Sequence, residues 1–421
     1  MFNRIKIILK DYSLRNKILF VLAVLVLFRI GSSIPIPGVD HAKLSAFLSN
    51  NQFFGLLDIF SGGGLSNLSI LMLGVAPYIT ASIIMQLFTM IFPKLKELYQ
   101  EEGEAGRQKF NQYSRLLTVP LGFLQGFGLM TMLQGQGILG AISFLDKFTN
   151  ISIMIAGTMV LLWLGELISE KGIGNGISLI IFGGIVAGLP STIQRTLFTF
   201  DPSQIPMYGL FLAIAVLIIG GVVIISEAER LVPVSYAKQV RGARMYGGVS
   251  THIPLKVNQA GVIPIIFAIS ILLFPQMIVN LLAGLNSGIV ASLSGYILAF
   301  LNNSFVYGAL YFILVFFFTY FYTAVTFDPK MISQNLQKSG AFVPGIRPGQ
   351  PTSDHLARII TRITLVGALF LGLIAVLPLG IKALTGISSL AIGGTALLIV
   401  VSVVLETSKQ IEAQVVMKEY E

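Results

Sequence analysis

The sequence contains no cysteine and carries little charge. The absence of cysteine excludes disulfide frameworks and thiolate metal sites. Only 11% of the 421 residues are Asp, Glu, Lys or Arg, whereas a soluble domain carries about 25%. Because 54% of the residues are also hydrophobic, an ordinary soluble fold is excluded, and we expect the chain to be surrounded by lipid.

Charge is missing altogether from several long stretches. Ile59–Pro93 has 35 residues without a charge and Val257–Phe327 has 71, whereas a membrane-spanning helix needs about 20 mainly apolar residues. The other uncharged runs are Leu116–Leu145, Phe148–Gly165, Gly172–Gln194, Pro202–Ser226, Ile363–Ile381 and Ala383–Leu405. With Ile18–Pro35 added, and two spans in the longest run, the pattern predicts ten spans. The expected fold class is therefore all-α, a polytopic membrane protein.

Basic residues gather in alternate loops. Of the 28 Lys and Arg residues, 23 fall in loops that would share one side of the membrane. Because loops rich in Lys and Arg remain in the cytoplasm, we expect both termini and the large basic loops to be cytoplasmic. The net charge of +9 is thus explained by topology, and it offers a docking surface for ribosomal RNA or anionic lipid.

The ten spans divide into two sets of five, in residues 1–195 and 196–421. An odd number of spans gives the two halves opposite orientations, which is the arrangement of an inverted repeat with its functional site between the halves. In the first half, the apolar pattern of Ser61–Leu73 is interrupted by three consecutive glycines. Such a segment predicts a discontinuous helix that lines a cavity.

The two largest basic loops, about 227–258 and 327–362, have distinctive compositions. Glu229–Arg244 alternates apolar and polar residues and predicts a β-hairpin or extended finger. Ser339–Pro351 contains three prolines and three glycines and predicts a fixed, non-helical loop.

Residues suited to catalysis or metal binding are sparse. His41, His252 and His355 lie in separate loops without partners at ligand spacing, and no Ser/His/Asp arrangement is present. Gly135–Gly140 matches G-x-G-x-x-G but does not follow a strand, so a dinucleotide site is not favoured. We therefore expect no metal, no cofactor and no enzymatic activity.

A secondary solute transporter is the alternative class. Such transporters carry ionisable residues within their spans. Here Arg29 is the main candidate, and we expect it to pair with backbone or polar groups near the outer interface instead of relaying protons. Glu166, Glu227 and Glu406 lie at predicted cytoplasmic ends. The lack of central charges disfavours the transporter hypothesis.

Two spans carry uncharged polar side chains. Thr80, Ser82 and Gln86 lie in the second span, and Asn258 and Gln259 open the seventh. Each alone is typical of ordinary hydrogen bonding between helices. Together they indicate a contact between helices that can part.

Several longer motifs occur in order along the chain. They are Arg29–Gly38, Phe60–Ser66, Pro77–Leu87, Gly172–Ser178, Ser250–Pro264 and Ser339–Gly349. These motifs closely resemble those of the SecY family, the central subunits of protein-conducting channels. The resemblance implies a passive channel that passes unfolded secretory proteins across the plasma membrane and releases membrane-protein segments laterally into it.

The resemblance also implies an hourglass pore with a ring of aliphatic side chains at its waist. The ring would consist of Val75, Ile79, Ile177, Ile181, Ile266 and Ile399. A collar of branched aliphatic side chains dewets and blocks ions, yet it deforms around a passing chain.

By the same resemblance, about residues 56–68 would form the plug, a short half-helix below the ring on the external side. The plug would include Ser61, Gly62, Gly63, Gly64, Leu65 and Ser66. The second and seventh spans would form a lateral gate that binds signal sequences, with Thr80, Ser82, Gln86, Asn258 and Gln259 along it.

The family further implies that the basic loops dock the ribosome or the SecA ATPase. The contacts would be Lys238, Arg241, Arg244 and Arg347. SecE and SecG would be companion subunits, and preproteins with signal sequences and membrane lipid would be further partners. Many relatives have a basic pair where this chain has Ala243–Arg244. The resemblance therefore implies the pore architecture but not the strength of docking.

Overall fold

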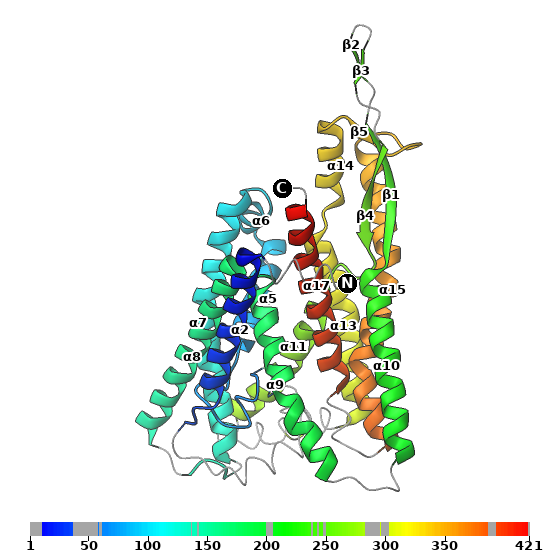
Figure 1. Ribbon diagram of the computed structural model, residues 1–421. Helices are drawn as coiled ribbons and strands as arrows, with labels where there is room; N and C mark the ends of the chain where they lie inside the picture. Colours follow the sequence, from blue (N-terminus) through cyan, green and yellow to red (C-terminus); the bar gives the residue numbers. More distant parts are fainter. Residues whose placement is uncertain are drawn as a thin grey trace.

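The computed structural model describes residues 11–36, 58, 61–135, 137–140, 143–198, 205–236, 239–241, 244–246, 250–282, 295, 303–385 and 393–419. Within them lie ten helices of 16 residues or more, two shorter helices and five strands (Figure 1). The long helices are α2 (Tyr12–Ser32), α5 (Ala76–Ile91), α7 (Gly103–Gly135), α8 (Phe144–Lys171), α9 (Gly176–Phe198), α10 (Ile205–Glu227), α11 (Ile263–Leu282), α13 (Ser304–Thr326), α15 (Gln350–Thr385) and α17 (Gly393–Glu419). The short ones are α6 (Pro93–Gln100) and α14 (Pro329–Lys338).

Each predicted span overlaps one of the long helices, which confirms the all-α fold class of a multi-pass membrane protein. By length and apolar composition alone, four helical stretches of the described residues can cross a membrane. They are Gly103–Gly135, Phe144–Lys171, Ser304–Lys338 and Gln350–Ile381, and α5 with α6 makes a fifth if this bent pair counts as one span. The number of ten spans is consistent with the structure, but it still rests on the uncharged runs of the sequence.

The bend between α5 and α6 has a local cause. The two helices meet at 117°, and Phe92 between them is extended, with φ −107° and ψ 108°. A residue before proline is disfavoured in the helical region, and Pro93 has no N–H to continue the helical hydrogen bonds. The second span therefore ends where the uncharged run of the sequence ends.

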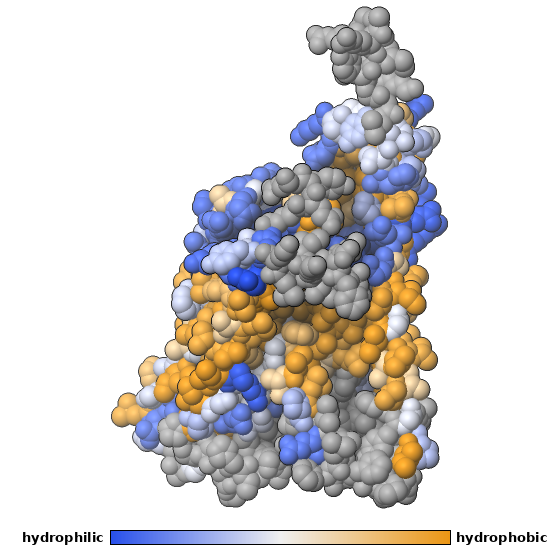
Figure 2. All heavy atoms as spheres, in the orientation of Figure 1, coloured by the Kyte–Doolittle hydropathy of each residue, from blue (hydrophilic) through white to orange (hydrophobic). Residues whose placement is uncertain are grey.

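The long helices stand side by side as a bundle (Figure 1). α2, α7 and α8 lie on one side, α10 and α15 on the other, and α9, α11 and α17 between them. Apolar side chains from both sides meet in one buried cluster, for example Val24 and Leu161 with Tyr311 and Leu371. On the face shown in Figure 2, hydrophobic residues form a band across the middle of the molecule, as expected for a surface that contacts lipid.

One end of the bundle, called here the sheet end, carries the strands and α14 (Figure 1). The strands are β1 (Glu229–Tyr236), β2 (Gln239–Arg241), β3 (Arg244–Tyr246), β4 (Ser250–Lys256) and β5 (Ala341–Phe342). β1 pairs antiparallel with β4 and with β5, and β2 pairs antiparallel with β3. The predicted β-hairpin is confirmed, and the predicted non-helical loop is confirmed up to the start of α15 at Gln350.

The sheet end has a small core of its own. Val232, Val234 and Leu255 from the strands are buried against Leu356 and Ile360 of α15. Because side chains of β1 and β4 point alternately to the two faces of the sheet, one face of the sheet packs in this core. The two basic loops are therefore parts of one folded unit that is fixed to α15.

The predicted plug departs from expectation in its local structure. Residues 61–75 run as successive turns with a single β-bridge, in place of the half-helix expected there. Gly62 and Gly63 have φ of +67° and +80°, and Leu68 has φ of +41°; these left-handed values break a right-handed helix. Of residues 51–60 only Asp58 lies within the described part, so the beginning of the predicted plug lies outside it.

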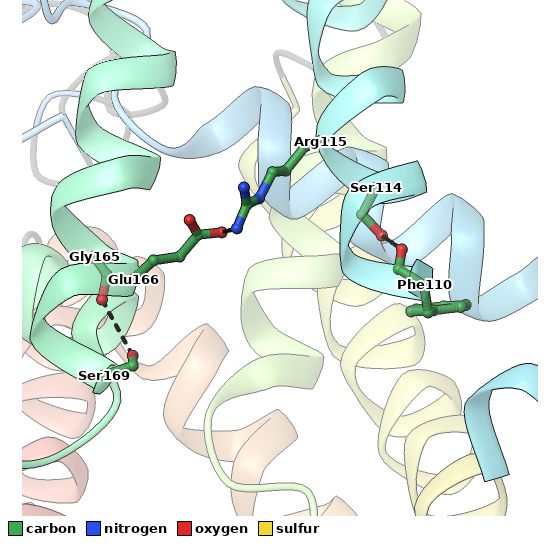
Figure 3. A network of polar contacts seen from close by, with 6 residues as sticks. All are labelled: Phe110, Ser114, Arg115, Gly165, Glu166 and Ser169. Atoms are coloured by element: carbon green, nitrogen blue, oxygen red, sulfur yellow. Dashed lines mark hydrogen bonds and ion pairs between the residues drawn. The ribbon is translucent and has the colours of Figure 1, made fainter. Parts of the chain in front are cut away.

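The turn between α8 and α9 depends on a close approach of two backbones. A Cβ atom on Gly176 would lie 1.7 Å from the carbonyl oxygen of Gly165. The Gly176 amide donates to the Ser169 hydroxyl oxygen (2.9 Å), and that hydroxyl donates to the Gly165 carbonyl (3.1 Å; Figure 3). Ser169 thus joins the two helix ends at a distance that only glycine permits.

We predict that Gly176→Ala lowers the free energy of unfolding by about 3 kcal/mol, because the new methyl group collides with the Gly165 carbonyl and forces the backbones apart. Thermal unfolding of the detergent-solubilised protein measures the change. Gly220→Ala is the control, since a Cβ there meets no atom within 4 Å and alanine favours a helix interior. Equal unfolding temperatures for the two variants would contradict the prediction.

Candidate functional site

The six predicted ring residues lie in one apolar cluster. They come from four helices: Val75 caps the start of α5 and Ile79 lies within it, Ile177 and Ile181 lie on α9, Ile266 on α11, and Ile399 on α17. Val75, Ile181, Ile266 and Ile399 are buried members of the cluster, while Ile79 and Ile177 are partly buried and pack against it. All six thus belong to the large apolar cluster at the centre of the bundle, together with many other side chains. Their arrangement as a ring around a pore stays a prediction.

The predicted plug residues are closed upon themselves by short hydrogen bonds. The Ser66 amide donates to Asp58 Oδ1 (2.6 Å), and the Leu65 amide donates to Ser61 Oγ (3.0 Å). The Ser61 hydroxyl donates in turn to the Asp58 carbonyl (3.0 Å). Polar side chains therefore form the hydrogen bonds to backbone groups that helical backbone partners would otherwise form. This role explains the serines of this segment.

The end of the same segment is joined to the chain that follows α2. The Ile36 amide donates to the Leu68 carbonyl (2.8 Å) and the Ile70 amide to the Ile34 carbonyl (3.0 Å), forming the β-bridge between Pro35 and Ser69. Leu65 and Leu68 are buried in a second apolar cluster with Ile36, Met130, Leu133 and Met154. Backbone pairing and apolar packing thus fix this end of the segment.

One predicted gate residue on α5, Thr80, is hydrogen-bonded to a side chain of α7 that the sequence did not point to. Gln125 of α7 is 9% exposed, and its Nε2 donates to Thr80 Oγ1 (3.2 Å). The Thr80 hydroxyl donates to the Ala76 carbonyl (3.0 Å). The available signal was the presence of an amide within the uncharged run Leu116–Leu145, but its partner lies 45 residues away.

The other gate residues have incomplete hydrogen bonding. Gln86 Nε2 approaches Ser82 Oγ (3.4 Å), and Asn258 Nδ2 donates to the Gly261 carbonyl (3.3 Å). Gln86 Oε1 and Asn258 Oδ1 are both buried without a hydrogen-bond partner. α5 contacts α11, the helix that follows Asn258 and Gln259. Each buried, unpaired acceptor costs about 1–3 kcal/mol.

An ion pair joins α7 and α8 (Figure 3). Arg115 Nη2 of α7 pairs with Glu166 Oε1 of α8, and Ser114 Oγ donates to the Phe110 carbonyl one turn away (3.1 Å). Glu227 at the end of α10 pairs likewise with Lys409 of α17 (2.8 Å). Two of the acidic residues considered for a transporter thus have basic partners.

The predicted docking residues gather at the sheet end. Arg347 is exposed, and its carbonyl accepts a hydrogen bond from Thr352 Oγ1 (2.8 Å) at the start of α15. Arg241 and Arg244 face each other in the β2–β3 register. Lys238 lies outside the described residues.

Comparisons with known proteins agree with one another. The SecY family model matches residues 69–408. A protein translocase subunit SecY of Corynebacterium glutamicum is 43% identical over 98% of this chain and 97% of its own length, and one of Streptomyces galbus is 44% identical over 97% and 96%.

Two solved structures of channel proteins have the same fold as this chain. A protein-conducting channel matches with a TM-score of 0.63 and 20% identity, over 96% of this chain and 93% of its own. Sec61 in the canine ribosome–channel complex matches with a TM-score of 0.60 and 20% identity over the same shares. The arrangement of helices in this chain is therefore that of known channel subunits.

We predict that the hydrogen bond between Gln125 and Thr80 couples their contributions to stability by about 1 kcal/mol, as for one buried neutral hydrogen bond. A double-mutant cycle of Gln125→Leu and Thr80→Val, read by thermal unfolding, measures the coupling. Thr118→Val, on α7 with its hydroxyl bonded to Ser114, should combine additively with Thr80→Val. Additive behaviour of the first pair as well would contradict the prediction.

Proposed function

This chain belongs to the SecY family and is a non-enzymatic protein translocase channel, and we propose that its pore is a passive opening between the two five-helix halves, residues 1–195 and 196–421. The observation that carries the proposal is the meeting of six aliphatic side chains from α5, α9, α11 and α17 in one cluster. A collar without hydrogen-bonding groups holds back ions and water but has no preference for any polypeptide sequence. The energy for translocation comes from partners that hydrolyse nucleotide.

The contact between α5 and α11 is the lateral gate in this proposal. Its support is that α5, which carries Thr80, Ser82 and Gln86, contacts α11, the helix that follows Asn258 and Gln259. A segment in the open gate moves into lipid according to its own transfer free energy. Leu or Ile at a span centre contributes about −0.3 to −0.6 kcal/mol, whereas Lys or Arg costs about 2.5 to 3.5 kcal/mol.

The sheet end faces the cytoplasm of a plasma membrane, together with both termini, and docks the partners that drive translocation. Those partners are the SecA ATPase and the ribosome, with SecE and SecG as companion subunits. The support is the exposed Arg347 on a folded unit fixed to α15, the 23 basic residues of the loops on that side, and a similar structure that is part of a ribosome–channel complex.

The proposal is tested by reconstituting the chain with SecE in vesicles and adding SecA, ATP and a preprotein. We expect the preprotein to become protected from external protease. Arg347→Glu should slow this import at unchanged channel abundance, because the reversed charge repels the docked partner, whereas Lys147→Glu, at the start of α8 and outside the basic loops, is the control for added negative charge. Uptake of a small solute without preprotein import would favour the transporter hypothesis instead.

A second prediction concerns the aliphatic collar. Replacing Ile79 and Ile266 together with serine should raise the resting ion conductance of planar bilayers by about tenfold or more, since hydroxyl groups hydrate the constriction. Ile224→Ser is the control, because Ile224 is 67% exposed on α10. Unchanged conductance of the double variant would mean that the two residues serve packing alone.

A further inference from the structure

Arg29 makes a long-range contact with the predicted plug. It lies in the last turn of α2, and its Nη1 donates to the carbonyl oxygen of Gly62 (3.1 Å), 33 residues along the chain. This bears out the expectation that Arg29 pairs with backbone instead of serving as a relay. A guanidinium is rarely retained in a membrane-spanning segment without a specific partner.

The end of α2 is built to hold this side chain in place. A positive charge in the last turn interacts favourably with the helix dipole. The hydroxyls of Ser32 and Ser33 both donate to the Arg29 carbonyl (2.8 and 3.0 Å). The backbone from which the guanidinium extends is thus fixed, although the side chain itself lies at an exposed position.

Gly62 and Gly63 present their backbone to Arg29 as no other residues could. A Cβ on Gly62 would lie 2.2 Å from Phe28 Cζ and 3.1 Å from the Cα of Gly184 on α9, and one on Gly63 would lie 3.3 Å from Arg29 Nη1. Both glycines also have left-handed φ, which side chains disfavour. Phe28 therefore requires glycine at position 62, and Arg29, the next residue after Phe28, binds the carbonyl of this glycine.

The two ends of the segment are held in different ways. Leu68–Ile70 is fixed by two backbone hydrogen bonds to Ile34 and Ile36 and by buried leucines. Gly62 is held toward α2 by one charge-assisted hydrogen bond that reaches it from a partly exposed side chain. Loss of that bond would release Gly62 from α2, while the hydrogen bonds of Gly64 to Ser69 and of Leu68–Ile70 to Ile34 and Ile36 remained.

We propose that Arg29 is a positioning residue, a latch that keeps Ser61–Gly64 in its resting place while the stretch from Leu65 to Ile70 anchors the segment. The inference rests on the proposed function, in which this segment stops the pore. A charge-assisted bond to a neutral carbonyl has no covalent or buried ionic component. It therefore opens reversibly when a polypeptide displaces the segment, and it reforms afterwards.

The test is the resting conductance of planar bilayers that contain the full chain with its translocase partners. Arg29→Gln should raise the conductance per channel by about three- to tenfold, as for the loss of one charge-assisted hydrogen bond at an exposed position. Arg29→Lys keeps a charged donor, so its conductance should lie between that of the wild-type chain and that of Arg29→Gln. Lys147→Gln is the matched control, since Lys147 bonds Thr131 on α7 and should leave the conductance unchanged.

Gly62→Ala provides an independent route to the same effect, because its methyl group pushes the carbonyl away from the guanidinium. Combined with Arg29→Gln it should add little further conductance, since both changes break one contact. Multiplicative effects, or wild-type conductance of Arg29→Gln at normal abundance, would overturn the latch. Preprotein import by the wild-type chain, measured in parallel, separates this outcome from failure of the proposed function.

Discussion

The bilayer requires every backbone N–H and C=O group at its depth to find a partner within the protein. Helices meet this requirement by themselves, but Ser61–Val75 is not helical and must be satisfied from outside. Asp58, Ser61 and Ser69 supply side-chain oxygens, and Ile34–Ile36 supplies a short ladder of backbone bonds. Enclosure by α2, α8 and α9 is what permits irregular backbone at this place, and with it a segment that is able to move.

A channel for polypeptides needs a closed state that is tight to ions and only slightly more stable than the open one. The six aliphatic side chains proposed as the collar suit the first need, because they carry no group that hydrates. The contact between α5 and α11, proposed as the lateral gate, suits the second need, because neither helix carries a charged residue and no ion pair joins them. Ion pairs are placed elsewhere, between α7 and α8 and between α10 and α17, where helices stay together.

The sequence predicted what depends on local pattern and missed what depends on tertiary contact. Uncharged runs located the spans, and alternation located the β-hairpin, because each pattern lies within one element. It also predicted the kind of partner that Arg29 has, but not that the partner is Gly62. The link between Gln125 and Thr80, and the crowding of Gly62 by Phe28 and Gly184, join residues far apart along the chain. Of the half-helix expected at about residues 56–68, Asp58 is helical, whereas residues 61–68 form turns, since consecutive left-handed glycines favour turns.

The length of α15 has a mechanical consequence. Its 36 residues span about 54 Å at 1.5 Å per residue, from the core of the sheet end through the bundle, with α13 alongside. A stiff rod clamped at both ends carries load along its axis with little loss. A force applied to the strands would therefore be transmitted along α15 to the helices that pack against it, far from the point where the force acts.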